Sequence, residues 1–123
     1  MISKDGVLRR LRALCLSLPE TSEVSSWGHP NFRAGRKTFV TFEAVRGRAS
    51  VAFRLSHTDI DLLLRREQFF ATPYGQGQWV SVWADGAMDW GLVRKLVENA
   101  YRQVALKRMI AVLDAKRVAR RAR

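Results

Sequence analysis

The chain has 123 residues, a length typical of one domain with one hydrophobic core. Apolar residues make up 47% of it, enough to fill such a core without a structural metal, and its single cysteine excludes an internal disulfide. Lysine and arginine total 22 against 11 acidic residues, and the resulting net charge of +11 favours polyanionic partners. Because the chain has neither a signal peptide nor an apolar run of roughly 20 residues, we expect a cytoplasmic protein that does not enter the membrane.

The first element is an amphipathic helix. Apolar residues recur at a helical spacing at Val7, Leu11, Cys15 and Leu18. Pro19 cannot continue a helix, so we expect the helix to end just before it. Cys15 lies on the apolar stripe, which predicts a buried thiol rather than a reactive one.

Three strand-like runs follow a turn at residues 27–30. They span residues 31–34, 37–45 and 49–56, and short connections that contain Gly35 and Gly47 separate them. Such connections are typical of β-hairpins.

Alternation within the second run divides its side chains between two faces. Val40 and Phe42 are expected on the core side, and Phe39, Thr41 and Glu43 on a wetter side. The sequence therefore predicts a sheet with one buried and one more polar face.

The second half of the chain begins with a helix, for which Thr58 is the expected N-cap. A short strand before Pro73 and a clearer strand at 79–83 follow. A long helix then begins at Asp89, which can cap it, and continues past Met109 before fraying.

The predicted order is α-β-β-β-α-β-β-α. Hairpin connections imply a mainly antiparallel sheet, so we expect an α+β fold, a two-layer α/β sandwich with the helices on one face. We divide the chain into a domain at residues 1–110 and a basic tail at 111–123, which is either a frayed helix or disordered.

Three segments resemble the MmcQ/YjbR family of small bacterial proteins: residues 18–21, Leu-Pro-Glu-Thr; residues 27–30, Trp-Gly-His-Pro; and residues 85–90, Asp-Gly-Ala-Met-Asp-Trp. The resemblance extends from about residue 8 to residue 107. It implies a two-layer fold with a double-wing motif, whose hairpin wings contact DNA. It implies neither catalytic residues nor a cofactor, and the arginine-rich end of this chain departs from the family pattern.

Basic residues gather in the predicted hairpins and near the C-terminus. Hairpin tips project from a domain and can contact a phosphate backbone, and an arginine-rich tail can lie along phosphates. The alternative is that these charges are solvated and protect exposed strand edges. The candidate nucleic-acid contacts are Arg33, Arg36, Lys37, Arg46, Arg48, Arg54, Lys116, Arg117, Arg120 and Arg121.

Aromatic residues on the wetter face offer a second kind of site. Aromatic and arginine side chains on a sheet can stack unpaired bases, although such aromatics also pack under loops or at dimer interfaces. The candidate stacking or pocket residues are Trp27, His29, Phe39, Tyr74, Trp79 and Trp83.

No pattern in the sequence predicts catalysis, a metal site or a cofactor. His29 has only His57 and Cys15 as further soft or borderline ligands, and their spacing matches no zinc pattern. We therefore expect a non-enzymatic protein that binds nucleic acid, DNA in particular, as a monomer or weak homodimer. The alternative is a small-molecule or protein-binding module that uses the open sheet face and the adjoining loops.

Overall fold

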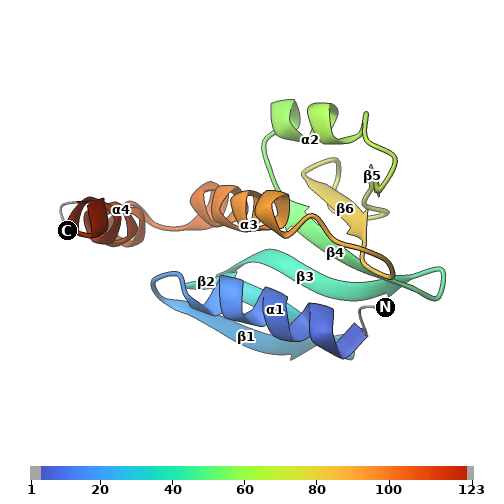
Figure 1. Ribbon diagram of the computed structural model, residues 1–123, viewed down its shortest axis with the longest axis horizontal. Coiled ribbons are helices and arrows are strands. Elements are labelled where there is room, and N and C mark those ends of the chain that lie inside the picture. Colours follow the sequence, from blue (N-terminus) through green and yellow to red (C-terminus); the bar gives the residue numbers. More distant parts are fainter. Residues whose placement is uncertain (1–3, 122–123) are drawn as a thin grey trace.

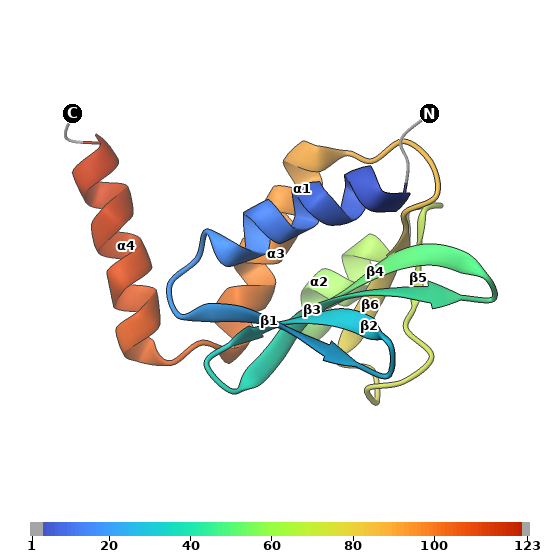
Figure 2. The ribbon, with the colours of Figure 1, turned by 90° about the horizontal axis from the view of Figure 1, so that it is seen from below.

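The computed structural model describes residues 4–121 (Figure 1). A six-stranded antiparallel sheet runs in the order β1-β2-β3-β4-β6-β5. Helices α1 and α3 lie above the sheet in Figure 2. We call the opposite face of the sheet, which is turned away from these helices, the open face. The strands are β1 (Thr21–Ser26), β2 (His29–Ala34), β3 (Lys37–Val45), β4 (Arg48–Arg54), β5 (Phe69–Ala71) and β6 (Trp79–Trp83).

Four helices complete the molecule: α1 (Lys4–Leu16), α2 (His57–Leu63), α3 (Trp90–Val104) and α4 (Lys107–Arg121). The observed order is α-β-β-β-β-α-β-β-α-α, so the predicted α+β class and antiparallel sheet are confirmed, with one strand and one helix more than expected. None of the helices between residues 4 and 121 has the length and apolar character needed to span a bilayer.

The core lies between the sheet and helices α1 and α3. Cys15 on α1 is fully buried there, as its place on the apolar stripe predicts. Burial raises the pKa of the Cys15 thiol, so the group is protonated at neutral pH. From α3, the buried Tyr101 packs edge-on against Phe39 and donates a hydrogen bond of 2.8 Å to the carbonyl of Pro19.

Strand β1 has no counterpart among the predicted elements. Its sequence, TSEVSS, is mostly polar and has one large apolar residue, Val24, because the strand lies at the edge of the sheet. Its Glu23 forms an ion pair of 2.5 Å with Arg12 on α1. The residues Trp27 and Gly28, predicted as a turn, join β1 to β2.

Phe39 lies on the helix side of the sheet, which corrects its predicted place on the wetter face. In the pairing of β2 with β3, Phe32 lies opposite Val40, but the next residue of β2, Arg33, lies opposite Thr38. Phe39 therefore has no partner in β2 and is an extra residue in β3. A β-bulge of this kind reverses the alternation of side chains before it. Phe39 is therefore fully buried and is no stacking residue.

The two predicted helix caps differ in outcome. Asp89 caps α3 as expected, since its Oδ1 accepts a hydrogen bond of 3.1 Å from the amide of Leu92. Thr58 is not the N-cap of α2; that role belongs to Ser56, whose Oγ accepts a hydrogen bond of 3.2 Å from the amide of Asp59.

The predicted long last helix is two helices. Ala105 has an extended backbone with φ −65° and ψ 147°, and α4 begins at Lys107. Residues 111–121, predicted as a frayed or disordered tail, continue α4. Met109 and Leu113 on this helix are buried in the same core as the sheet, so the predicted boundary at residue 110 lies inside one packed helix.

Candidate functional site

The connection between β2 and β3 lies against the start of α4. A Cβ atom on Gly35 would be 3.9 Å from the sulfur of Met109. The Gly35 amide donates to the carbonyl of Glu20 at 3.0 Å, and the carboxylate of Glu20 pairs with Arg108 at 2.8 Å. These contacts place the 35–36 turn beside the first residues of α4.

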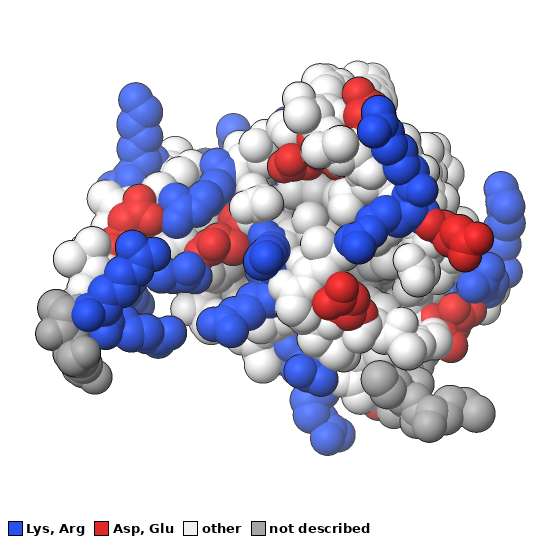
Figure 3. All heavy atoms as spheres, turned by 45° about the horizontal axis from the view of Figure 1, so that its top comes forward, with Lys and Arg blue, Asp and Glu red and all other residues white. Residues whose placement is uncertain are grey.

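Cations collect at this end of the molecule, which we call the basic end: Arg36, Lys37 and helix α4. Arg36 and Lys37 are exposed and form no ion pair with a described residue. Basic side chains also stand out around α4, near the left edge of the surface in Figure 3. On α4, the exposed cations without an ion pair to a described residue are Lys107, Lys116, Arg120 and Arg121.

Arg117 differs from its neighbours on α4 because it is not free. It pairs with Glu98 on α3, and one turn away Arg102 pairs with Asp114 at 2.7 Å. Both carboxylates are therefore occupied in holding α4 against α3. The pairing of Asp114 with Arg102 also lowers the pKa of this carboxyl, and it stays ionised at neutral pH.

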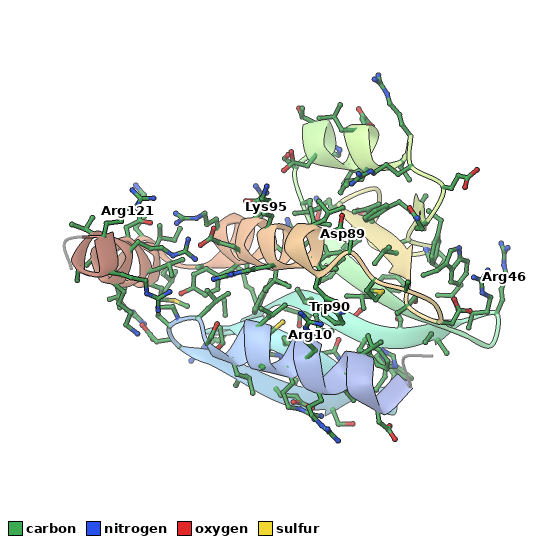
Figure 4. All side chains as sticks on the ribbon, viewed as in Figure 1. Arg10, Arg46, Asp89, Trp90, Lys95 and Arg121 are labelled. Atoms are coloured by element: carbon green, nitrogen blue, oxygen red, sulfur yellow. The ribbon has the colours of Figure 1, made fainter. Side chains whose placement is uncertain are left out.

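A groove with a volume of about 320 Å³ runs between α1, α3 and α4. Its apolar residues include Leu14, Val97 and Leu113. Arg10 of the same groove lies over the ring of Trp90, 4.7 Å from its centroid, and Figure 4 shows these two side chains together. The basic residues that line the groove are Arg10, Arg94, Lys116, Arg117 and Arg120.

The hairpin tip between β3 and β4 lies at the opposite end of the molecule, as the labels of Arg46 and Arg121 in Figure 4 show. Arg46 is exposed. Arg48 makes a two-point ion pair with Asp85, with Nε at 2.7 Å and Nη2 at 3.1 Å from the carboxylate oxygens. Its guanidinium also lies 3.9 Å from the ring centroid of Trp83. Of the two predicted contacts at this tip, only Arg46 forms no such bond with residues 4–121.

Arg33 and Arg54, the remaining predicted cations of the hairpins, are half-buried within the sheet. The Nε atom of Arg33 is buried and has no hydrogen-bond partner among the described residues. Arg54 lies opposite Trp79 in the register of β4 and β6. These two side chains are less available to a phosphate backbone than those at the tips.

The open face carries a second hollow, which we call the open-face pocket. Its volume is about 500 Å³, and the turn between β1 and β2 and the loop before β6 border it. Four of the predicted stacking or pocket residues, Trp27, His29, Tyr74 and Trp79, line it together, and the other lining residues are Asn31, Thr38, Thr41 and Glu43.

Glu43 is the centre of a polar cluster in this pocket, although its side chain is only 7% exposed. The hydroxyl of Tyr74 donates to Glu43 Oε1 at 2.6 Å, and His29 Nε2 lies 3.7 Å from Oε2. Burial, together with the bond to Glu43, raises the pKa of Tyr74, so this hydroxyl remains a donor at neutral pH. Within the described part of the chain, no three His, Cys, Asp or Glu side chains gather in a way suited to a metal ion.

The other two predicted aromatic residues lie outside this pocket. Trp83 stacks on Phe70 with ring centroids 4.1 Å apart and is covered by Arg48, whereas Phe39 is in the core. Glu43 was not among the predicted site residues, since an acid on a wetter strand face suggests solvent exposure. The one available signal was its position on the same predicted face as the aromatic residues.

Comparison with known proteins identifies a family and a fold. The YjbR family model matches residues 16–103. Among solved structures, a Deinococcus radiodurans protein aligns with a TM-score of 0.67 at 14% identity over 93% of this chain and 92% of its own. A Pseudomonas syringae protein aligns with a TM-score of 0.58 at 13% identity, over 68% of this chain and 86% of its own. No curated protein matches the chain.

Proposed function

The chain belongs to the YjbR family, and we propose that this member binds double-stranded DNA through its basic end. The observation that carries the proposal is a set of exposed cations that runs from the 35–36 turn along α4, none of which pairs with an acid between residues 4 and 121. Arg36 and Lys37 lie at the turn, beside the first residues of α4, whereas Arg120 and Arg121 lie in the last turn of the helix.

In this proposal α4 supplies a row of charges that follows the phosphate backbone, and the hairpin tip supplies a second contact beside it. Such contacts position a protein on DNA without reading its sequence, so we expect little sequence preference. Released counterions provide the driving force, and the affinity therefore falls steeply as the salt concentration rises. The ion pairs of α4 with α3 support this function because they hold the helix in place.

The test is a titration with a fluorescent DNA duplex at two salt concentrations. Arg120 and Arg121 have a matched control in Arg65 and Arg66, an adjacent arginine pair beyond α2 that is also exposed. We expect R120A/R121A to weaken binding roughly tenfold at low salt and to reduce the salt slope by about 2. R65A/R66A removes the same charge and should change the affinity less than threefold. Equal losses in both variants would mean that net charge alone drives binding.

A second pair of variants distinguishes the basic end from binding by both hairpin tips. Strand β3 has 9 residues, so its two ends lie about 27 Å apart. We expect R36A/K37A to weaken duplex binding and R46A to leave it nearly unchanged. A comparable loss in R46A would instead indicate that the duplex contacts both tips, as in a double-wing arrangement.

A further inference from the structure

The carboxylate of Glu43 has unused hydrogen-bonding capacity inside the open-face pocket. An ionised carboxylate can accept about four hydrogen bonds. Tyr74 donates one, to Oε1, and His29 Nε2 is 3.7 Å from Oε2, too far to donate a second. No other side chain between residues 4 and 121 donates to this group. A buried acid in this state favours a ligand that brings N–H donors.

Trp27 contributes almost nothing to the packed core. The residue is 94% exposed, although indole is a large and mostly apolar side chain. Its backbone has φ +54°, a conformation that a bulky residue adopts only with strain. Trp27 therefore forms an exposed aromatic wall of the pocket.

Trp79 forms a second wall, and the loop before β6 fixes its position. A Cβ atom on Gly75 would lie 2.3 Å from Trp79 Cδ1, so only glycine allows the backbone to approach the indole this closely. The ring of Tyr74 lies 6.4 Å from that of Trp79. The pocket thus combines the fixed indole of Trp79, the exposed indole of Trp27 and the buried carboxylate of Glu43.

We propose that the open-face pocket binds a planar nitrogen heterocycle of the nucleobase type, which stacks on Trp27 or Trp79 and donates N–H hydrogen bonds to Glu43. Stacking on aromatic side chains combined with hydrogen bonds to the base edge is how proteins recognise unpaired bases. An organic cation is less suited to the site, because the chain has a net charge of +11 and Arg54 lies opposite Trp79.

The acceptor also selects among bases. Guanine presents adjacent N–H donors on its Watson–Crick edge, which a carboxylate can accept together. Uracil presents one N–H between two carbonyl oxygens, and these oxygens would repel Glu43. We therefore expect guanosine to bind more tightly than uridine. The base can come from a free nucleoside or from a single strand, and a paired base in a duplex has no free edge to offer.

The experiment is calorimetric titration of the full chain with guanosine and uridine, which carry no phosphate, and with a single-stranded guanine-rich oligonucleotide and a duplex. We expect guanosine to bind roughly tenfold more tightly than uridine. E43Q keeps the shape of the side chain and should remove this preference, whereas E67Q neutralises an exposed acid outside the pocket and should keep it. W27A should weaken guanosine binding about tenfold, and W27F should restore most of it.

Two results would overturn the proposal: no binding of either nucleoside or of the single strand, or guanosine binding that E43Q and W27A leave unchanged. If the oligonucleotide binds and the nucleosides do not, and E43Q weakens it, the base is taken from a strand. The inference is independent of duplex binding at the basic end. R120A/R121A should leave guanosine binding unchanged, and E43Q should leave duplex binding unchanged.

Discussion

The two hairpin tips at the ends of β3 carry similar sequences and differ in what their cations do. At one end Arg36 and Lys37 form no ion pair with a described residue and lie beside the start of α4. At the other end Arg48 is bound to Asp85 and covers Trp83, and Arg46 is the one cation of this tip without an ion pair to any residue that the structure describes. The comparison shows that the number of basic residues in a segment does not tell how many of them can contact a partner. A neighbouring acid or aromatic ring can already bind a basic side chain.

The largest effect is expected from removing the side chain that joins α4 to the 35–36 turn. Met109 is fully buried, so M109A should lower the free energy of unfolding by about 2–4 kcal/mol. V112A, at an exposed position of the same helix, should change it by less than about 0.5 kcal/mol. Denaturant unfolding followed by circular dichroism measures both. Equal stability of M109A and the parent chain would show that α4 is not held to the body by this contact.

A smaller gain in stability is expected at two turns whose residues have positive φ. Trp27 and Gly28, like Arg46 and Gly47, both have positive φ, as in a type I′ turn, which favours asparagine at its first position. W27N and R46N should each raise the free energy of unfolding by about 0.5–1 kcal/mol. Thermal unfolding provides the measurement. Only W27N should also weaken nucleoside binding, and a loss of stability in both variants would contradict the strain argument.

A substitution at Asp85 tests whether Arg48, once released from its ion pair, can contact DNA. D85N removes the partner of Arg48, and we expect duplex affinity to rise about twofold and the salt slope to increase by up to about 1. D61N makes the same charge change at an exposed position on α2 and should have less effect. Fluorescence titrations at two salt concentrations measure both variants. No difference between the two would mean that Arg48 takes no part in DNA binding even when it is released.

The smallest expected effect is on the pKa of Asp85, and acidification measures it. The bond from Arg48 lowers the pKa of Asp85, so the pair is intact above the ordinary aspartate pKa of about 3.9 and is lost as the pH falls through the lowered value. Carboxyl chemical shifts in an NMR titration would follow Asp85 directly. In R48A its pKa should rise towards the ordinary value, and an unchanged value would contradict the observed contact.

Most of the fold follows from periodicity and turn residues, and each element that the sequence did not predict has a physical reason. β1 was missed because an edge strand buries little, so its sequence needs only Val24 as a large apolar residue. The break at Ala105 has no proline or glycine nearby to indicate it. Contacts distant in the sequence accompany the break, among them the bond of Arg108 to Glu20 and the burial of Met109.

The pocket was foreseen in part. Trp27, His29, Tyr74 and Trp79 were singled out as aromatic or turn residues, and the fold brings them together. Glu43 was not, because the hydroxyl that donates to it belongs to Tyr74, a residue 31 positions away. Local patterns show which face of a strand a side chain occupies, but they do not show which loop covers that face.

The reactivity of the buried Cys15 thiol would report how often the core opens to solvent. A thiol that is fully buried and protonated at neutral pH cannot attack an alkylating reagent, so modification must wait until α1 leaves the sheet. With one cysteine in the chain, each labelled molecule then records one such event. Labelling rates of Cys15 measured with and without a bound partner would show whether binding at a distant surface changes how often the core opens.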